Sequence, residues 1–340
     1  MWKEGSHYVS LSAGRCHVRI AGPASGAPVL LIHGATVPGW EFDRIVPWLT
    51  DAGFRTVCPD LFGHGDSDRP DVRYDSALFT RQLEDLMYSL AFDQRVHLLS
   101  HSLGSVIAAQ LVIRDARFYG NVACVAPMLD FTGKRKAMRV MELPVIGEAL
   151  MHAYALPMLV RRRRRRYCNI EDGRFPARFE AQLKVPGFGR ALLSLIRSGI
   201  LGDQSDCYRL LDATANSVAV LRGSDDEIFS DAQALRLREC LPGAQFVEID
   251  ATPHSVLLTH PERIAPLLIR FLQRSQIAPL ESPMQLQLAH QPSASVAGAA
   301  QFDVCRRSRC AASMRFSSPA ASVSARSARP RAVSNSPAAN

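Results

Sequence analysis

Long apolar runs are missing from this sequence of 340 residues, and none approaches the roughly 18 residues that a membrane-spanning helix requires. The first residues, 1–7, contain no basic region followed by an apolar stretch, so we expect no signal peptide and a cytoplasmic location. Hydrophobic residues make up 47% and charged residues 21%, which excludes a collagen, a coiled coil and a wholly disordered chain. We therefore expect a soluble protein with a full apolar core.

Paired cysteines are also missing. The eight cysteines are scattered, none forms a C-x-x-C pair, and no group of them has the spacing of a zinc site. This pattern excludes a small disulfide-stabilised domain and indicates reduced thiols. We expect no metal ion and no cofactor.

Positive charge is unevenly distributed along the chain. The formal net charge is +8, and residues 275–340, with seven Arg, no Lys, one Glu and one Asp, contribute five of these charges. The same segment is rich in Ser, Ala and Pro and has almost no large apolar residues, so we predict that residues 277–340 form a disordered tail.

A second concentration of positive charge is the run of arginines from Arg161 to Arg166. It is a candidate for weak contact with an anionic membrane surface. Neither this run nor the tail carries the combination of aromatic and basic residues that RNA-binding modules use, so we expect no nucleic-acid partner.

Strand and helix patterns alternate over most of the chain. Short apolar runs predict strands at 17–20, 27–32, 55–58, 94–99, 121–126, 217–221 and 245–249. Amphipathic patterns predict helices at 42–52, 78–90, 103–114 and 263–273. Such alternation favours an α/β fold with a mostly parallel sheet and helices on both faces. Residues 128–212 contain no strand pattern, so we expect a helical cap there.

The clearest chemical motif surrounds Ser102. An apolar strand runs into Ser100-His101-Ser102-Leu103-Gly104, and a helix follows directly. A serine at such a turn is held in strained backbone geometry with its hydroxyl projecting above the sheet. The amide of Leu103 lies at the start of the helix, where unpaired N–H groups favour an oxyanion.

A second motif follows the strand at 27–32, in the sequence His33-Gly34-Ala35. The glycine allows the chain to turn so that the next amide points at the serine. We expect the amide of Ala35 to be the second oxyanion donor, beside that of Leu103. His33 is expected to hold the loop by hydrogen bonding.

An acid and a histidine follow the last two predicted strands. Asp226 lies three residues after a strand-ending glycine, and His254 lies in the loop after 245–249. A neutral imidazole can accept a serine proton, and a carboxylate can fix its tautomer. Asp225 and Asp130 remain alternatives for the acid, and His260 is a nearby competitor for the base.

These segments together resemble the α/β-hydrolase fold superfamily. The resemblance covers about residues 10–275 and rests on HGATVPGW, CPDLFGHGDSDRP, LLSHSLGS, RGSDDEIF and ATPHSVLLTHPE. It implies a catalytic triad of Ser102 as nucleophile, Asp226 as acid and His254 as base. It also implies an α/β-hydrolase core at 1–127 and 213–276 with the cap at 128–212. Ser100 is a departure, because glycine is usual at that position.

The segment at 58–70 corresponds to a turn-rich loop in that superfamily. We expect structural roles for four residues of this segment, Asp60, Gly63, Gly65 and Ser67. His64 and Asp66 are close in sequence, but no third ligand with suitable spacing accompanies them. We therefore predict no metal site at this loop.

The residue at the turn between strand and helix, Ser102, restricts the reactions that are expected. Superfamily members such as haloalkane dehalogenases and many epoxide hydrolases carry aspartate where this chain has Ser102. Together with apolar segments in the predicted cap, the serine predicts a lipase-like serine esterase that cleaves lipophilic carboxylic esters, monoacylglycerol-like ones among them. The alternatives are a carbon–carbon bond hydrolase of ring-fission products, which usually has tryptophan where Ser255 stands, and a non-catalytic ligand-binding member.

Overall fold

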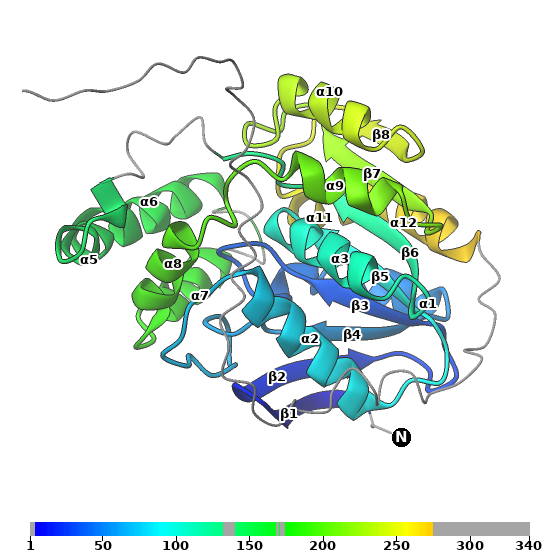
Figure 1. The fold of residues 1–340 in the computed structure, drawn as a ribbon, viewed down its shortest axis with the longest axis horizontal. Helices are drawn as coiled ribbons and strands as arrows, with labels where there is room; N and C mark the ends of the chain where they lie inside the picture. The colour runs from blue at the N-terminus through cyan, green and yellow to red at the C-terminus, as the bar shows by residue number, and fades with distance from the viewer. Residues whose placement is uncertain (1–3, 132–139, 168–169, 171–173, 275–340) are drawn as a thin grey trace, which may run out of the picture. The chain divides into compact units, whose positions relative to one another are not determined.

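The fold is built on one sheet of eight strands (Figure 1). The computed structural model describes residues 4–131, 140–167, 170 and 174–274, so the predicted tail at 277–340 lies outside the described residues. The strands are β1 (Gly5–Leu11), β2 (Gly14–Ala21), β3 (Pro28–Ile32), β4 (Arg55–Pro59), β5 (Val96–His101), β6 (Tyr119–Val125), β7 (Val218–Gly223) and β8 (Gln245–Ile249).

The strand order across the sheet is β1-β2-β4-β3-β5-β6-β7-β8. β1 pairs antiparallel with β2, and β2 pairs antiparallel with β4. Every other neighbouring pair is parallel. Because parallel strands end at the same edge, the loops after β3, β5, β7 and β8 meet there, and that edge carries the predicted site.

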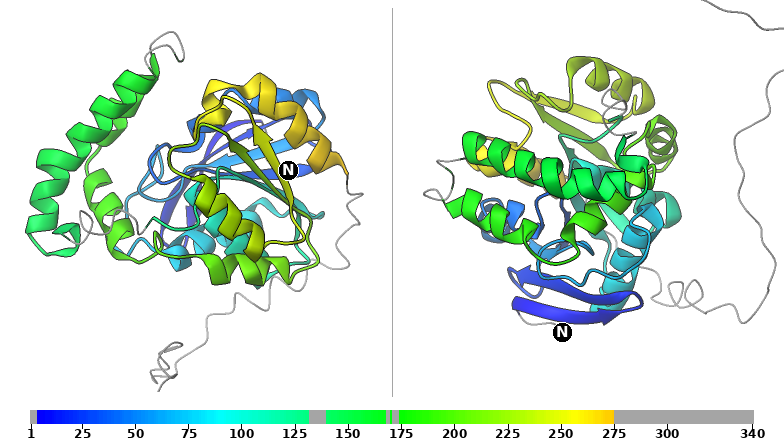
Figure 2. Two further views of the ribbon diagram at one scale, coloured as in Figure 1. Left: turned by 90° about the horizontal axis from the view of Figure 1, so that it is seen from above. Right: turned by 90° about the vertical axis from the view of Figure 1, so that its left-hand side faces the viewer.

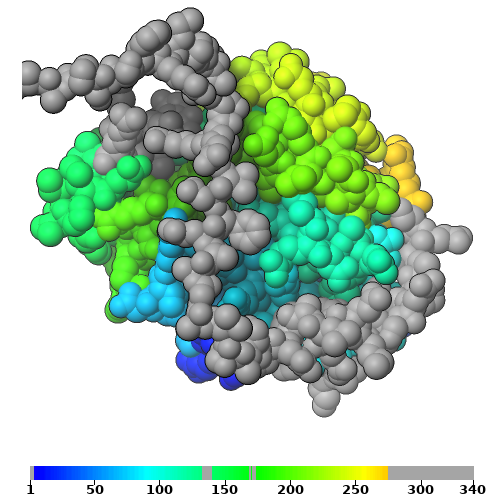
Figure 3. Space-filling model, viewed as in Figure 1, coloured from blue at the N-terminus to red at the C-terminus, as the bar shows by residue number. Residues whose placement is uncertain are grey.

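Helices cover both faces of the sheet (Figure 2), as the sequence predicts. Alternate residues of β3 belong to different apolar clusters, with Leu30 in one and Leu31 in the other. The first cluster includes residues of α2 (Ser76–Leu90), α3 (Leu103–Arg114), α9 (Ser205–Asp212) and α10 (Asp231–Cys240). The second includes residues of α1 (Val46–Asp51), α11 (Val256–Thr259) and α12 (Pro261–Gln273). Figure 3 shows α3, α9 and α10 side by side on the first face.

Between β6 and β7 the described elements are all helical. Ahead of α9 these are α5 (Ile146–Leu150), the π-helix η3 (Met151–Ala155), α6 (Leu156–Arg166), α7 (Arg174–Leu183) and α8 (Phe188–Arg197). Apolar side chains of η3, α6, α7 and α8 form a third cluster, which also takes in Val37 and Trp40 from the segment after β3 and Leu258 of α11. α9 lies within the predicted cap range but packs with α3 and α10, so the division at 128–212 stays a prediction.

Three elements differ from the sequence-based expectation. α10 was not predicted, because its apolar residues are few and give only a weak amphipathic pattern. β1 was not predicted, because as an edge strand it is largely exposed and has no apolar run. The helix expected at 42–52 is two elements, the 3-10 helix η1 (Gly39–Phe42) and α1, since Pro47 lies in the first turn of α1, where proline starts helices. None of the described helices is long and apolar enough to cross a membrane.

Candidate active site

Ser102 occupies a sharp turn between β5 and α3. Its φ of 51° and ψ of −117° lie in a region that a residue with a side chain rarely adopts. Gly104 permits this turn, because a Cβ at that position would lie 2.2 Å from the backbone oxygen of Ile32. The helix therefore starts directly against β3, and the serine is presented at the carboxyl edge of the sheet.

Ser100 stands where glycine was expected, and the structure accommodates it. Its side chain is fully buried, and its hydroxyl lies 3.1 Å from both Ser105 Oγ and the Ala123 carbonyl oxygen. A buried hydroxyl with partners carries little penalty. The departure from the usual pattern therefore leaves the turn intact.

Asp226 and His254 are brought together from the loops after β7 and β8. His254 Nδ1 donates to Asp226 at 2.8 Å from Oδ2 and 3.0 Å from Oδ1. The amides of Ile228 and Phe229 also donate to Asp226 Oδ1, each at 2.8 Å. Both side chains are buried. The carboxylate is thus fixed by backbone donors, and it orients the imidazole.

The other candidates for the acid and the base lie elsewhere. Asp225 is exposed, and Asp130 pairs with Arg236 at 3.4 Å. His260 Nδ1 bonds the neighbouring Thr259 hydroxyl at 2.8 Å. Of the three predicted acids, Asp226 is the one that bonds His254.

The electrostatics of His254 favour its neutral form. Burial lowers the pKa of His254 below its ordinary value of 6.5, and the positive charges of His101 and Arg163 lower it further, although Asp226 acts in the opposite direction. A neutral imidazole with Nδ1 held by a carboxylate leaves Nε2 as a proton acceptor. Among the described residues the Ser102 hydroxyl has no hydrogen-bond partner. Catalytic hydrogen bonds are often long or poorly aligned before substrate binds.

The two predicted oxyanion donors belong to residues close to the serine. Leu103 is the first residue of α3, and Ala35 follows Gly34, where a Cβ would lie 3.4 Å from Ser102 Cβ. Neither amide donates a hydrogen bond to any other part of the chain that the structure describes. Two unpaired N–H groups beside a candidate nucleophile are what an oxyanion hole requires.

Two histidines hold the loop that carries Ala35. His33 Nε2 accepts from the Leu61 amide at 2.8 Å, and its Nδ1 lies 2.8 Å from the Gly34 carbonyl oxygen. His64 Nε2 lies 2.9 Å from the Ala35 carbonyl oxygen. Both rings are buried, and burial lowers the pKa of each. His33 therefore supports the loop, as expected, and His64 does the same.

Glu41 and His101 form a buried pair that no sequence pattern predicted. Glu41 Oε2 lies 3.1 Å from His101 Nδ1, and Glu41 Oε1 accepts from the Gly34 amide at 2.9 Å. His101 Nε2 lies 3.1 Å from the backbone oxygen of His254. Both partners of His101 are acceptors, so only the imidazolium satisfies them. Burial opposes that charge, but Glu41 outweighs it and raises the pKa of His101.

The Glu41–His101 pair links the loop that carries Ala35 to the loop that carries His254. Glu41 holds the loop before Ala35, and His101 holds the backbone of His254. No sequence motif marked Glu41, because an acid that follows Trp40 at a helix start is typical of a surface position.

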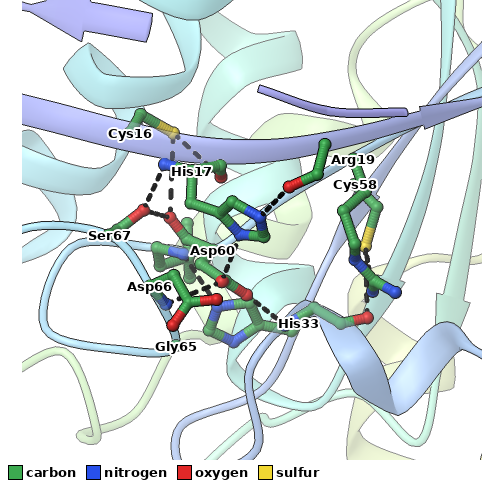
Figure 4. A network of polar contacts seen from close by, with 12 residues as sticks. Cys16, His17, Arg19, His33, Cys58, Asp60, Gly65, Asp66 and Ser67 are labelled. Atoms are coloured by element: carbon green, nitrogen blue, oxygen red, sulfur yellow. Dashed lines mark hydrogen bonds and ion pairs between the residues drawn. The ribbon is translucent and has the colours of Figure 1, made fainter. Parts of the chain in front are cut away.

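A second buried network surrounds Asp60, which directly follows β4 (Figure 4). Its carboxylate accepts from His17 Nδ1 at 2.8 Å, the Gly39 amide at 2.8 Å and the Asp66 amide at 3.0 Å. His17 Nε2 lies 2.7 Å from Ser6 Oγ. The atoms of His17, Asp60 and Asp66 that could bind a metal ion lie within 4.8 Å of one another. Those of His17 and Asp60 already serve hydrogen bonds, and the absence of a metal stays a prediction.

The loop at 60–67, which carries Asp60 and Asp66, requires small residues. A Cβ at Gly65 would lie 2.1 Å from Asp60 Oδ2, and Gly63 has a φ of 87°. Ser67 Oγ donates to the Asp60 carbonyl oxygen at 2.6 Å and accepts from the His17 amide at 2.9 Å. These contacts are structural in kind, and through Gly39 they position η1 and Glu41.

The arginine run forms the last turns of α6. Five of the six side chains are exposed, and Arg163 is half-buried. Arg164 pairs with Glu180 and Arg166 with Glu227. Arg163 instead reaches the site, which the sequence analysis did not foresee, because the helical phase of a uniform arginine run cannot be read from the run itself. The predicted membrane contact stays a prediction.

Comparison with known proteins agrees with this architecture. Residues 29–267 match the model of the family described as the alpha/beta hydrolase family. A non-heme chloroperoxidase of Streptomyces lividans is 25% identical over 283 residues, which cover 74% of this chain and 94% of that protein.

Solved structures show the same fold. The crystal structure of Cfl2 from Burkholderia cenocepacia superposes with a TM-score of 0.68 and 22% identity, over 79% of this chain and 95% of that one. An enol-lactonase from Burkholderia xenovorans gives a TM-score of 0.66 and 18% identity, over 78% and 99% respectively. At these identities the likeness concerns the fold, and the reaction must be argued from the site.

Proposed function

The chain belongs to the alpha/beta hydrolase family, and we propose that it is a serine hydrolase that cleaves carboxylic esters through an acyl-enzyme. One observation carries the proposal: a strained serine at the strand–helix turn shares the sheet edge with a buried Asp226–His254 pair. Serine at this turn, rather than aspartate, favours an acyl-enzyme over an alkyl-enzyme. Family membership alone supports only a hydrolase, so the ester is the proposed part.

In the proposed reaction, His254 Nε2 takes the proton of the Ser102 hydroxyl as the oxygen attacks the ester carbonyl carbon. The carbonyl π bond breaks, and the resulting oxyanion accepts from the amides of Ala35 and Leu103. The C–O bond to the alcohol then breaks, and the imidazolium of His254 protonates the leaving oxygen. Water, deprotonated by His254, then attacks the acyl carbon; the bond from that carbon to Ser102 Oγ breaks, the acid leaves, and the imidazolium of His254 returns a proton to Oγ.

Asp226 and His101 have separate parts in this scheme. Asp226 holds the tautomer of His254 that has its proton on Nδ1 and stabilises the imidazolium when it forms. His101 bonds the His254 backbone and not its ring, so it is a positioning residue. Its positive charge also helps to keep the resting His254 neutral.

The surroundings support a substrate with an apolar part. Aromatic and aliphatic side chains of α6, α7 and α8 pack with Val37, Trp40 and Leu258, which lie next to the proposed oxyanion loop and the His254 loop. An acyl or alcohol group that enters between the cap helices and the sheet edge would meet these side chains. This supports lipophilic esters over small, fully polar ones.

The test is hydrolysis of p-nitrophenyl esters, from acetate to laurate, by wild type and Ser102→Ala, beside labelling with a fluorophosphonate. We expect turnover and labelling in the wild type and neither in the variant. Absence of both in the wild type would overturn the serine hydrolase. Labelling without ester turnover would instead favour the carbon–carbon bond hydrolase.

A further inference from the structure

Arg163 differs from the other arginines of α6 in where it points. Its guanidinium turns toward the sheet edge, with Nη2 donating to Thr36 Oγ1 and Nη1 to Tyr167 Oη, each at 3.0 Å. The guanidinium also lies over two aromatic rings, 5.2 Å from the centroid of Tyr167 and 5.5 Å from that of Phe179. These contacts fix a cation above the loops of the site.

Both hydroxyls that Arg163 contacts flank proposed catalytic groups. Thr36 directly follows Ala35, the proposed oxyanion donor. The Tyr167 hydroxyl bonds that of Ser255, which directly follows His254. The guanidinium is therefore held between the oxyanion loop and the His254 loop. Its charge also contributes to the lowered pKa of His254, which places it within electrostatic reach of the base.

This cation has no anionic partner in the part of the chain that the structure describes. Arg164 and Arg166, on the same helix, each have a glutamate, whereas both hydrogen-bond partners of Arg163 are neutral hydroxyls. A half-buried charge without a counterion is costly, and its cost is recovered when an anion arrives. Two of the five N–H groups of a guanidinium are used here, which leaves three for a ligand.

We propose that Arg163 binds an anionic group of the substrate, a carboxylate in the simplest case. This inference rests on the proposed esterase function and deepens it: the preferred esters carry a negative charge besides an apolar part. The planar fork of a guanidinium pairs with a carboxylate through two parallel hydrogen bonds, which gives orientation as well as affinity. Arg163 is then a specificity residue contributed by the cap.

A competing explanation is that Arg163 only fastens α6 to the loop of Thr36. A fastening residue affects all esters alike, whereas an anion-binding residue affects charged esters selectively. Two matched pairs separate these explanations. For a charge on the acyl side, the p-nitrophenyl monoester of glutarate is compared with p-nitrophenyl valerate. For a charge on the alcohol side, 4-carboxyphenyl butyrate is compared with phenyl butyrate.

The variants are Arg163→Gln, Arg163→Lys and, as a control, Arg162→Gln, which removes an exposed arginine of the same helix. For the charged member of at least one pair, Arg163→Gln is expected to lower kcat/KM by about 10- to 100-fold, mainly through KM. The neutral member should change by less than about threefold. Arg163→Lys should restore part of the loss, because it keeps the charge but not the fork. Arg162→Gln should match the wild type.

Binding to the Ser102→Ala protein, measured by calorimetry with the charged and the neutral ester of each pair, decides the question without turnover. Weaker binding of a charged ester alone, on adding Arg163→Gln, supports the inference. Equal losses of affinity for charged and neutral esters, or a wild type that does not prefer the charged member of either pair, would overturn the inference. The esterase proposal would still stand. A wild type that binds the charged esters but neither cleaves esters nor reacts with fluorophosphonate would overturn the proposed function instead.

Discussion

Two buried histidines lie side by side at the carboxyl edge of the sheet, with ring centroids 5.0 Å apart, and each has a carboxylate on Nδ1. His254 comes from the loop after β8 and pairs with Asp226 from the loop after β7. His101 ends β5 and pairs with Glu41 from η1. The residue types are alike, yet the pKa of His254 is lowered and that of His101 is raised.

Burial opposes the charged form of both rings, and Glu41 outweighs it at His101, whereas the positive charges of His101 and Arg163 add to it at His254. The contacts of the second ring nitrogen also differ. His101 Nε2 faces a backbone carbonyl oxygen, so the ring needs both protons and has no capacity to accept one. His254 Nε2 has no hydrogen-bond partner among the described residues and stays available. Charged neighbours and the contact of the second ring nitrogen together make one histidine–carboxylate pair available as a base and hold the other as a cation. Four substitutions or conditions test this contrast.

The largest effect is expected from Asp226→Asn. The amide presents an N–H or an uncharged oxygen to His254, so the tautomer is no longer fixed and the imidazolium is no longer stabilised. We expect kcat to fall by about 10³- to 10⁴-fold with a smaller change in KM. Steady-state kinetics on a neutral p-nitrophenyl ester measure it. Near-full activity would move the acid to another residue, and Asp225→Asn serves as the matched control that should stay active.

Glu41→Gln should act on the other pair, with a smaller effect on rate and a large one on stability. It leaves a buried imidazolium without its counterion, which costs about 3–5 kcal/mol when such pairs are broken. We expect kcat/KM to fall by about 10- to 100-fold, because the Gly34 and His254 backbones lose a charged anchor.

The stability loss in Glu41→Gln should depend on pH. Because the folded-state pKa of His101 is raised, the stability that the pair contributes is fully present below the ordinary value of 6.5 and is lost as pH rises through the raised value. The difference from wild type in urea unfolding should therefore be largest at about pH 6 and shrink as the pH rises through the raised value. The exposed-acid variant Asp71→Asn is the control, and a stability loss that grows with rising pH would contradict a charged His101.

The pH dependence of the wild type tests the neutral state of His254. Burial, aided by His101 and Arg163, lowers its pKa, so kcat/KM should rise with pH to a plateau with a midpoint below 6.5. Below the midpoint the rate should fall about tenfold per pH unit. Arg163→Gln removes one nearby positive charge and should move the midpoint upward. A wild-type midpoint above 7 would contradict the buried, neutral base.

The smallest effect is expected from Tyr167→Phe. It removes the hydroxyl between Arg163 and Ser255 but keeps the ring in the apolar cluster. We expect kcat/KM for neutral esters to fall by about threefold or less, which corresponds to one uncharged hydrogen bond. A loss comparable to that of Asp226→Asn would mean that Tyr167, rather than the pairs at the sheet edge, controls the site.

The parts of the site that the sequence predicted are those set by local backbone structure. A strand that runs into a serine and a helix fixes the turn at Ser102, and the loops after parallel strands bring Asp226 and His254 to the same edge. These relations follow from a few consecutive residues and from the parallel order of the sheet. The eight-stranded fold was predictable for the same reason, apart from the exposed edge strand β1.

The parts that the sequence did not predict depend on contacts between distant segments. Glu41 meets His101 across 60 residues, and Arg163 meets Thr36 across 127. Neither contact produces a local sequence pattern, because the residues around a glutamate or an arginine do not show whether its side chain is buried. In a run of identical arginines only the packing of α6 decides which one turns inward. Such residues require the tertiary structure.

The most direct test of the account is to look for the acyl-enzyme itself. Wild-type protein is mixed with p-nitrophenyl butyrate, quenched in acid within milliseconds to seconds, digested and analysed by mass spectrometry. We expect a butyryl group on the peptide that contains Ser102 in the wild type and none in Ser102→Ala. Ester cleavage with no butyryl group at Ser102, or with the group on another residue, would contradict it.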